Sequence, residues 1–165
     1  MPLSVRPAGE GDLPAIDGIY NHYVRETAIT FDLDPFSDEQ RREWFTHYAA
    51  SGPRQLVVAD LEGALVGYAC SSRFRPKGAY ATSVETTIYL APGHTRRGLG
   101  TQLYAGLFAR LEGQDVHRAY AGVTLPNPAS LALHRRFGFR EVGTYREVGR
   151  KLGRYWDVLW LEKRL

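Results

Sequence analysis

The segment His94–Leu103, His-Thr-Arg-Arg-Gly-Leu-Gly-Thr-Gln-Leu, organises the chain around it. It follows an alternating segment, Thr82–Leu90, whose pattern predicts a strand. Apolar residues recur at helical spacing within and after it, at Leu99, Leu103, Leu107 and Leu111. A strand, a glycine-bearing turn, a helix and a further strand in this order require one parallel crossover in a sheet.

The turn between this strand and helix has the features of an anion site. The first turn of a helix has backbone N–H groups without partners and carries partial positive charge. Gly98 and Gly100 allow close approach to the backbone, and Arg96 and Arg97 add charge. We therefore predict a phosphate or pyrophosphate site. The segment is not a Walker A loop, because no Gly-Lys-Ser/Thr follows. It is not a GxGxxG fingerprint either, because Leu103 stands at the last glycine position. A turn without a ligand is the alternative.

Length and composition predict one soluble domain, 1–165. A chain of 165 residues is long enough to bury a core. The net charge is +3 and the arginines are spread along the chain, which favours neither nucleic acid nor membrane as a partner. Cys70 is the only cysteine, so no intramolecular disulfide is possible and we expect it to be buried. No His, Asp or Glu cluster has metal-ligand spacing, so we expect no metal.

The first residues, Met1–Pro7, lack the apolar core of a signal peptide. No stretch approaches transmembrane length. We therefore expect a cytoplasmic protein.

Turn and capping residues divide the chain into strands and helices. Predicted strands cover 3–7, 55–60, 64–72, 80–90, 116–125, 139–148 and 154–161. Predicted helices begin at Asp12, Ser37, Gly98 and Asn127, and end near Thr27, Ser51, Glu112 and Gly138. Ala28–Phe31 is expected to be extended. The order, β-α-α-β-β-β-α-β-α-β-β, predicts a mixed-sheet α/β domain of about seven strands and four helices.

Three helix starts carry capping signals. Asp12 is expected to cap the first helix, which has Pro14 in its first turn. The sequence from Ser37 to Gln40 is a capping box. Asn127 is expected to cap the last helix.

Glu85 is an acidic residue within a strand of mostly β-branched and apolar residues. With a period of two, Glu85, Thr87 and Tyr89 share one face of that strand. A carboxylate in mid-sheet costs free energy unless it is solvated or paired. One interpretation is a solvent-facing strand residue. The other is a general base in a cleft, which takes a proton from an attacking nucleophile.

The last helix carries three candidate polar residues. His134 has apolar neighbours. It is therefore either a packed core histidine or a group that binds substrate or shuttles a proton. Asn127 and Ser130 either cap the helix or form hydrogen bonds to a ligand at its start.

The loop before the Glu85 strand is basic and aromatic. Arg75, Lys77 and Tyr80 belong to this region. It is either a solvated loop or a binding loop for a carboxylate-bearing substrate. A second basic turn, Val148–Val158, lies between the last two strands.

Several motifs, in order along the chain, resemble the phosphinothricin/methionine sulfoximine N-acetyltransferases, a branch of the GNAT superfamily. They are Val5–Ala8 with Ile19–Val24, Ser83–Leu90 after Tyr80, His94–Gly100, Leu125–Ser130 with Leu133-His134 and Gly138-Phe139, and Val148–Gly153 with Asp157-Val158. The resemblance implies a GNAT-type, mostly antiparallel sheet. It also implies acetylation of the amino group of a small amino-acid-like molecule.

The resemblance also implies roles for individual residues. Acetyl-CoA, the acetyl donor, would be held by Ile88, Tyr89, Leu90, Thr95, Arg96, Arg97, Gly98, Leu99, Gly100, Thr101, Asn127 and Ser130. Catalysis would use Glu85 as base, with His134, by direct attack on the thioester. Substrate would be bound by Arg75, Lys77, Tyr80, Glu85 and His134. The protein would be a homodimer, with Lys151–Val158 near the partner's active site.

Departures from the branch lie at Thr95, at Tyr155-Trp156 and in the loop 73–79. The last two fall where substrate would be recognised, so they bear on the acceptor rather than on the chemistry. Alternative acceptors are a polyamine, an aminoglycoside or a protein N-terminus. The alternative to an enzyme is a non-catalytic sensor domain that binds acyl-CoA. Such a domain would have no need of Glu85.

Overall fold

A computed structural model describes residues 3–95 and 98–165. These residues form a seven-stranded sheet in the order β1-β2-β3-β4-β5-β7-β6. The strands are β1 (Ser4–Pro7), β2 (Leu56–Leu61), β3 (Ala64–Arg73), β4 (Ser83–Leu90), β5 (Arg118–Thr124), β6 (Arg140–Lys151) and β7 (Arg154–Arg164). The helices are α1 (Leu13–Glu26), α2 (Asp38–Phe45), α3 (Leu99–Leu111) and α4 (Pro128–Arg136), with 3₁₀ turns at Glu10–Asp12 and Gly78–Tyr80. The predicted order of elements is confirmed.

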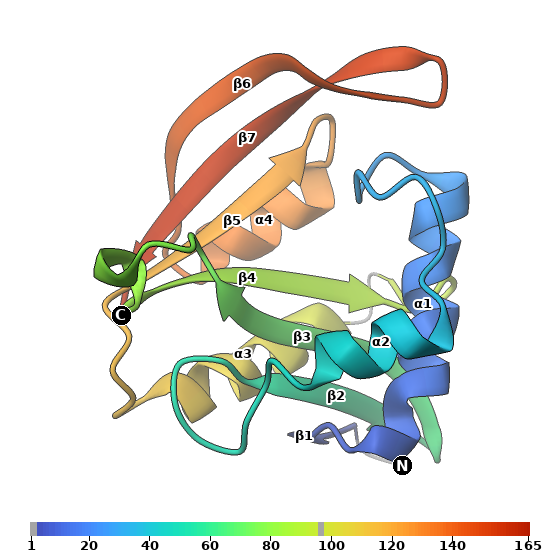
Figure 1. Ribbon diagram of the computed structural model, residues 1–165, viewed down its shortest axis with the longest axis vertical. Coiled ribbons are helices and arrows are strands. Elements are labelled where there is room, and N and C mark those ends of the chain that lie inside the picture. Colours follow the sequence, from blue (N-terminus) through green and yellow to red (C-terminus); the bar gives the residue numbers. More distant parts are fainter. Residues whose placement is uncertain (1–2, 96–97) are drawn as a thin grey trace.

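The β4–β5 pair is parallel, and every other pair in the sheet is antiparallel. It is also short, because only Ser83–Glu85 pair with Arg118–Tyr120. Beyond Glu85, β4 continues beside β3 while β5 continues beside β7. The two strands therefore diverge, as Figure 1 shows. The sheet opens into a V whose vertex is at Glu85.

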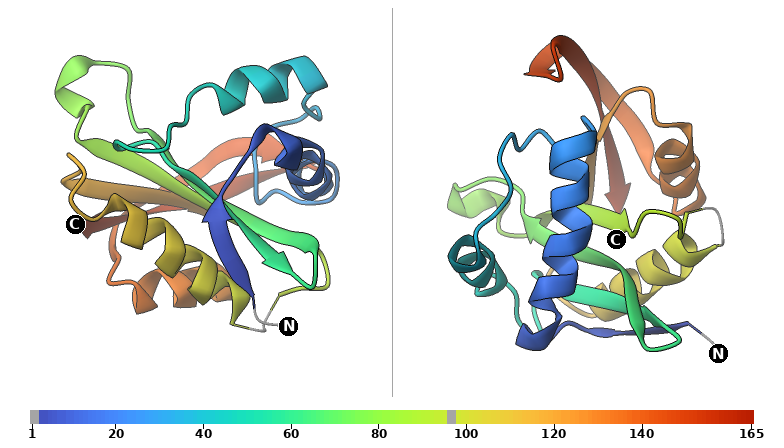
Figure 2. Two further views of the ribbon diagram at one scale, coloured as in Figure 1. Left: turned by 90° about the horizontal axis from the view of Figure 1, so that it is seen from below. Right: turned by 90° about the vertical axis from the view of Figure 1, so that its right-hand side faces the viewer.

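Helices cover both faces of the sheet, α3 and α4 on one and α1 and α2 on the other (Figure 2). Strand alternation supplies both cores. Along β2, Val57 and Ala59 pack with α3, whereas Leu56 and Val58 pack with α1. Cys70 is buried in the α1 cluster, which confirms its predicted core position.

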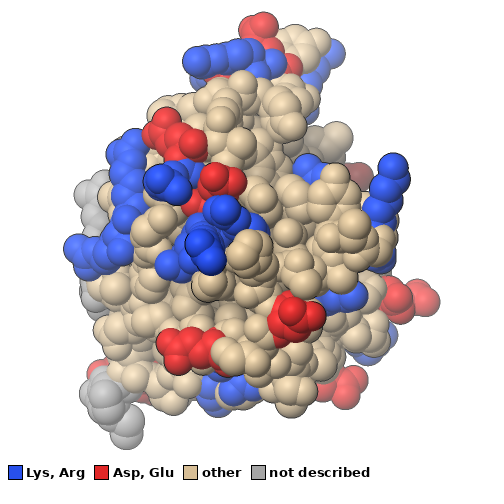
Figure 3. All heavy atoms as spheres, turned by 90° about the vertical axis from the view of Figure 1, so that its left-hand side faces the viewer, with Lys and Arg blue, Asp and Glu red and all other residues tan. Residues whose placement is uncertain are grey.

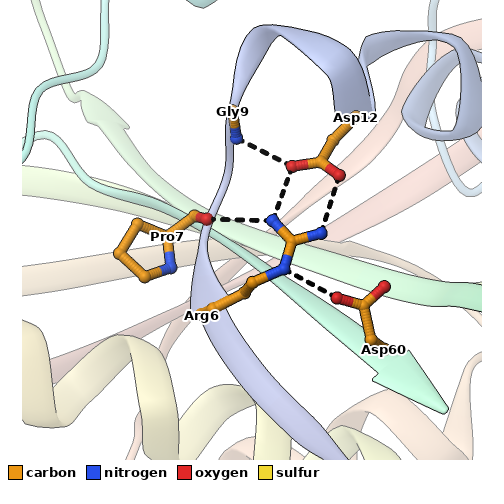
Figure 4. A network of polar contacts seen from close by, with 5 residues as sticks. All are labelled: Arg6, Pro7, Gly9, Asp12 and Asp60. Carbon is orange, nitrogen blue, oxygen red and sulfur yellow. Dashed lines mark hydrogen bonds and ion pairs between the residues drawn. The ribbon is translucent and has the colours of Figure 1, made fainter. Parts of the chain in front are cut away.

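An ion-pair network ties β1 to β2 at the start of α1 (Figure 4). Arg6 donates two hydrogen bonds of 2.8 Å to Asp12 and one of 2.7 Å to Asp60. The Gly9 N–H donates to the same Asp12 carboxylate at 2.7 Å. Asp12 stands at the N-cap position of α1 with Pro14 in the first turn, as predicted, but its carboxylate binds Arg6 and the preceding turn and makes no capping bond to α1. The Arg6 guanidinium holds the pKa of the Asp12 carboxyl below its ordinary value.

Two segments between α1 and β2 differ from prediction. The capping box is confirmed, since Ser37 Oγ accepts from the Gln40 N–H and Gln40 Oε1 accepts from the Ser37 N–H. The helix ends at Phe45, well before Ser51, in a tight turn of i→i−3 backbone hydrogen bonds. Ala28–Phe31 forms bends rather than an extended strand, and its neighbours in space are described below.

The last two strands are longer than predicted and form a hairpin that extends beyond the rest of the sheet (Figure 1). Its turn residues Leu152 and Gly153 have φ of 52° and 76°, the left-handed values that suit a two-residue hairpin turn. The hairpin carries apolar side chains that are each more than half exposed: Val142, Tyr145, Val148, Leu152 and Tyr155.

Charged side chains are mixed on the face shown in Figure 3, where Lys and Arg alternate with Asp, Glu and uncharged areas. Within the described ranges, no helix is long and apolar enough to cross a membrane.

Candidate active site

Two hollows meet where β4 and β5 diverge. The outer cleft, of about 550 Å³, lies between β4, the start of α3 and α4. The inner cavity, of about 240 Å³, lies between β4, β5, β7 and the loop after α1. Ile29, Ile88, Tyr89, Asn127 and Ser130 line both, so the two hollows are continuous.

Most residues predicted to hold a cofactor line the outer cleft: Ile88, Tyr89, Leu90, Thr95, Gly98, Gly100, Thr101, Asn127 and Ser130. The Leu99 side chain is buried in the core, so its backbone is the part of this residue that is left for a ligand. Arg96 and Arg97 lie outside the described residues. Sequence reasoning missed Tyr23 and Arg136, which also line the cleft.

The start of α3 forms one end of the outer cleft. Gly98 precedes the helix with φ of 73°, a left-handed conformation that favours glycine. The first intrahelical bond at this end runs from the Gln102 N–H to the Gly98 carbonyl at 3.2 Å. The N–H groups of residues 99–101 therefore have no intrahelical acceptor. Gly98 has no side chain that could cap this helix, and among the described residues no other side chain does so, which leaves the amides available to an anion.

One edge of β4 is open beside the outer cleft. In an antiparallel pair, successive residues direct their backbone groups to alternate edges of the strand. The Ala91 N–H donates to β3 and the Leu90 carbonyl accepts from the Tyr23 hydroxyl at 2.6 Å, which fixes the alternation. The backbone groups of Ile88 then face the gap, beyond the last residue of β4 that pairs with β5. They can bind an extended ligand as a neighbouring strand would.

Glu85 lies in the wall of the inner cavity, at the vertex of the V. It is partly buried, so the predicted solvent-facing alternative does not describe it. Among the described residues, no group donates a hydrogen bond to its carboxylate. Burial raises the pKa of Glu85, and the positive charge of Arg75 lowers it by a smaller amount. A carboxylate with a raised pKa is a better base near neutral pH.

His134 is 3% exposed, and protein groups bind both of its ring nitrogens. The Ser130 carbonyl lies 2.7 Å from Nδ1 and can only accept, so Nδ1 carries the proton. Nε2 then accepts from the Tyr104 hydroxyl at 3.0 Å, and that hydroxyl accepts from Thr86 Oγ1 at 2.7 Å. Burial lowers the pKa of His134, which keeps the ring neutral. The sequence did not reveal Tyr104 as a polar partner, because its helical spacing fits a core residue.

Asn127 caps α4, as predicted. Its Oδ1 accepts from the Ser130 N–H at 3.1 Å, and Pro128 stands in the first turn of the helix. Asn127 and Ser130 also line the two hollows, so the capping and ligand interpretations of these two residues are compatible.

Comparison with known proteins identifies the family. The sequence matches the model described as "Acetyltransferase (GNAT) family" over residues 16–139. The chain belongs to the GNAT acetyltransferase family. It is 59% identical to the phosphinothricin N-acetyltransferase of Streptomyces coelicolor, over 99% of this chain and 96% of that protein. It is 36% identical to the L-methionine sulfoximine/L-methionine sulfone acetyltransferase of Pseudomonas aeruginosa, over 100% and 96%.

A solved structure agrees with this assignment. The GNAT superfamily phosphinothricin acetyltransferase of Sinorhizobium meliloti, crystallised in complex with AcCoA, matches this acetyltransferase with a TM-score of 0.93. The two chains are 32% identical, and the match covers 100% of this chain and 89% of that one. The predicted family and the predicted enzyme class are thereby confirmed.

The basic loop of this acetyltransferase contributes one cation near the inner cavity. The Arg75 guanidinium lies 4.3 Å from the Phe74 ring centre and 5.7 Å from that of Trp160, which lines the cavity. Lys77 and Tyr80 line a separate pocket of about 70 Å³, together with Arg75. The structure therefore brings Arg75 towards Glu85 and leaves the other two predicted substrate residues outside the inner cavity.

The remaining wall of the inner cavity is the loop after α1. Ile29, Thr30 and Phe31 line it opposite β7. Sequence reasoning missed them, because they form no regular element and carry no catalytic group. In the described part of the acetyltransferase, no group of three His, Cys, Asp or Glu side chains is placed to hold a metal ion.

The hydrogen-bond chain through His134 predicts a pH effect. The folded pKa of His134 lies below its unfolded value of about 6.5, so the unfolded state binds more protons between the two values. Folding stability should therefore fall as pH falls through that window. Tyr104→Phe removes a donor to the neutral ring, so it should raise the folded pKa and flatten this slope. NMR titration of His134 and denaturation at several pH values measure both effects.

Tyr48→Phe is the matched control. It removes a hydroxyl that lies 2.9 Å from Ser72 Oγ and leaves the His134 chain intact. We expect no change in the His134 titration in that variant. If His134 in the wild type titrates at its ordinary pKa, this would contradict the assignment of Tyr104 as a hydrogen-bond donor to a buried, neutral His134 ring.

Proposed function

We propose that this protein transfers the acetyl group of acetyl-CoA to the amino group of a small amino-acid-like acceptor, of the phosphinothricin, methionine sulfoximine or methionine sulfone type. The observation that carries the proposal is the position of Glu85 in the inner cavity, beside a cleft whose helix amides are suited to an anion. The names of the relatives support the acceptor class.

The outer cleft fits the donor. Its free amides at residues 99–101 suit the pyrophosphate, and Thr95 and Arg136 add polar lining. The open edge of β4 at Ile88 suits the amide groups of the pantetheine arm. When bound, acetyl-CoA supplies an acetyl group activated as a thioester.

In the inner cavity, Glu85 acts as the general base. An amino acid arrives as an ammonium ion, which cannot attack until it loses a proton. Glu85 takes that proton directly or through a water molecule, and the amine lone pair becomes available. The amine nitrogen forms a bond to the acetyl carbon, and the bond from that carbon to sulfur breaks. The nitrogen then gives up its second proton, and the leaving thiolate takes up one proton to become the thiol. The energetic advantage of Glu85 is its raised pKa, which burial causes.

Two other residues define the chemistry around Glu85. We assign Arg75 to the acceptor carboxylate, because its charge acts on Glu85 and its guanidinium lies 5.7 Å from the ring centre of Trp160, which lines the cavity. We assign His134 a positioning role, since its nitrogens hold Ser130 and Tyr104 and leave neither free for a substrate. Cys70 forms no acyl-enzyme, because it is buried and burial raises the pKa of its thiol.

Thiol release from acetyl-CoA tests the proposal. The acceptor panel contains phosphinothricin, methionine sulfoximine, methionine sulfone, ordinary amino acids, spermidine, an aminoglycoside and a peptide. We expect turnover with the methionine-like compounds. Glu85→Gln should lower kcat by about 100-fold or more, because general-base catalysis contributes about that much. In the wild type, the rate should fall as pH falls through the raised pKa of Glu85, because the protonated acid cannot accept a proton.

The control is the dissociation constant of acetyl-CoA, which Glu85→Gln should leave unchanged. Turnover confined to spermidine, the aminoglycoside or the peptide would overturn the acceptor class. Binding of acetyl-CoA without turnover of any amine would favour a sensor. An unchanged rate in Glu85→Gln would refute the assignment of the base.

A homodimer is part of the proposal. The exposed apolar side chains of the β6–β7 hairpin, including Tyr145, Val148 and Tyr155, are suited to contact with a second copy. The segment Lys151–Val158 would then lie near the partner's active site. Sedimentation equilibrium at micromolar concentration should give twice the chain mass of 18.6 kDa. Val148→Glu should shift the protein towards the monomer, and a wild type that stays monomeric contradicts the proposal.

A further inference from the structure

A buried lysine connects the β6–β7 hairpin to the loop after α1. Lys151, the last residue of β6, is only 6% exposed. Its Nζ donates a hydrogen bond of 2.7 Å to the backbone carbonyl of Thr30. The partner is a neutral carbonyl, so the pair is not a salt bridge. Burial lowers the pKa of Lys151, and the charge of Asp32 opposes this shift.

A second contact joins the same two segments. The Phe31 ring lies against the backbone of Gly149, two residues before Lys151. A Cβ at position 149 would lie 2.2 Å from Phe31 Cε2, which is closer than two carbon atoms can approach. The ring therefore occupies the space of the missing side chain.

The far side of the loop is also held. The Thr30 hydroxyl lies 2.9 Å from the Tyr20 hydroxyl of α1, and Thr30 Oγ1 accepts a hydrogen bond of 3.3 Å from the Asp32 N–H. The Tyr20 hydroxyl donates to Asp32 as well. Thr30 thus uses its side chain towards α1, and its carbonyl towards Lys151. Lys151 and Gly149 are the contacts by which β6 fixes this loop.

We propose that Lys151 is a positioning residue for the acceptor site, which it serves by holding the wall Ile29–Phe31 over the inner cavity. This rests on the proposed function of the inner cavity as the acceptor site. Burial of an ammonium group costs free energy that an apolar side chain of similar size would avoid. The Lys151 ammonium group binds the carbonyl of Thr30, which is the middle one of the three consecutive wall residues Ile29–Phe31. Loss of the bond should impair acceptor binding more than donor binding or chemistry.

The test is the kinetics of Lys151→Met. We expect the acceptor KM to rise about tenfold, as for loss of a buried charge-assisted hydrogen bond. The kcat should change by less than about threefold, because an interaction made equally in ground and transition states affects KM alone. The dissociation constant of acetyl-CoA should not change. Gly149→Ala, which displaces Phe31 without removing a charge, should raise the acceptor KM in the same way.

Lys163→Met is the matched control. The Nζ of Lys163 also donates to a backbone carbonyl at 2.7 Å, that of Phe137, which lines neither hollow. This variant should leave the acceptor KM unchanged. An unchanged acceptor KM in folded Lys151→Met or Gly149→Ala overturns the proposal, and so does an equal loss of acetyl-CoA binding.

Backbone hydrogen exchange separates this proposal from the proposed function. In Lys151→Met, residues 28–32 should exchange faster than in the wild type, and they should not do so in Lys163→Met. This readout needs no acceptor. If the wild type acetylates nothing in the panel, the proposed function fails. Hydrogen exchange alone then tests whether Lys151 holds the loop after α1. Unchanged exchange in Lys151→Met then overturns its positioning role.

Discussion

The divergence of β4 and β5 after Glu85 is the constraint on which both hollows depend. A continuous parallel pair would fill this space with ladder hydrogen bonds, and Ile88 would be bonded to β5. Because the pairing ends at Glu85, backbone groups of β4 stay open on one side and a carboxylate stands at the vertex. The proposed donor cleft, acceptor cavity and base thus follow from one feature of the sheet.

The elements around the V keep it open. From one side, the chain Thr86, Tyr104, His134 and Ser130 bonds β4 and α3 to α4 through buried hydrogen bonds. From the other side, Tyr20 and Lys151 hold the loop after α1. Each polar atom in the His134 chain has a partner, which avoids the cost of burying it unpaired. A rigid rim suits a reaction in which an amine and a thioester must meet in a fixed geometry.

The sequence was sufficient for features that depend on neighbouring residues. The strand before Gly98, the helix after it and the glycine turn between them follow local rules of periodicity and backbone freedom, and so does the cap at Asn127. Glu85 stood out because a carboxylate is unusual in such a strand. The turn motif includes Leu99, whose side chain helix geometry directs into the core while its backbone stays at the start of α3.

Features that join distant segments could not be predicted. Tyr104 and His134 are thirty residues apart, and nothing in either segment indicates that a hydroxyl of one meets a nitrogen of the other. Lys151 and Thr30 are 121 residues apart. The place of Arg75, Lys77 and Tyr80 around a pocket separate from the inner cavity depends on the path of the loop, which periodicity does not determine. The bonding of the Asp12 carboxylate could not be predicted for the same reason, since its partner Arg6 lies on a neighbouring element.

Backbone amide exchange with and without acetyl-CoA tests the central claim most directly, because that claim concerns backbone groups. The account predicts that acetyl-CoA slows exchange at the Ile88 amide and at residues 99–101. The strand-paired residues Ser83–Glu85 should be unaffected. Binding of acetyl-CoA with no protection at Ile88 would show that the open edge of β4 is not the donor site, and the account built on the divergence of β4 and β5 would fail.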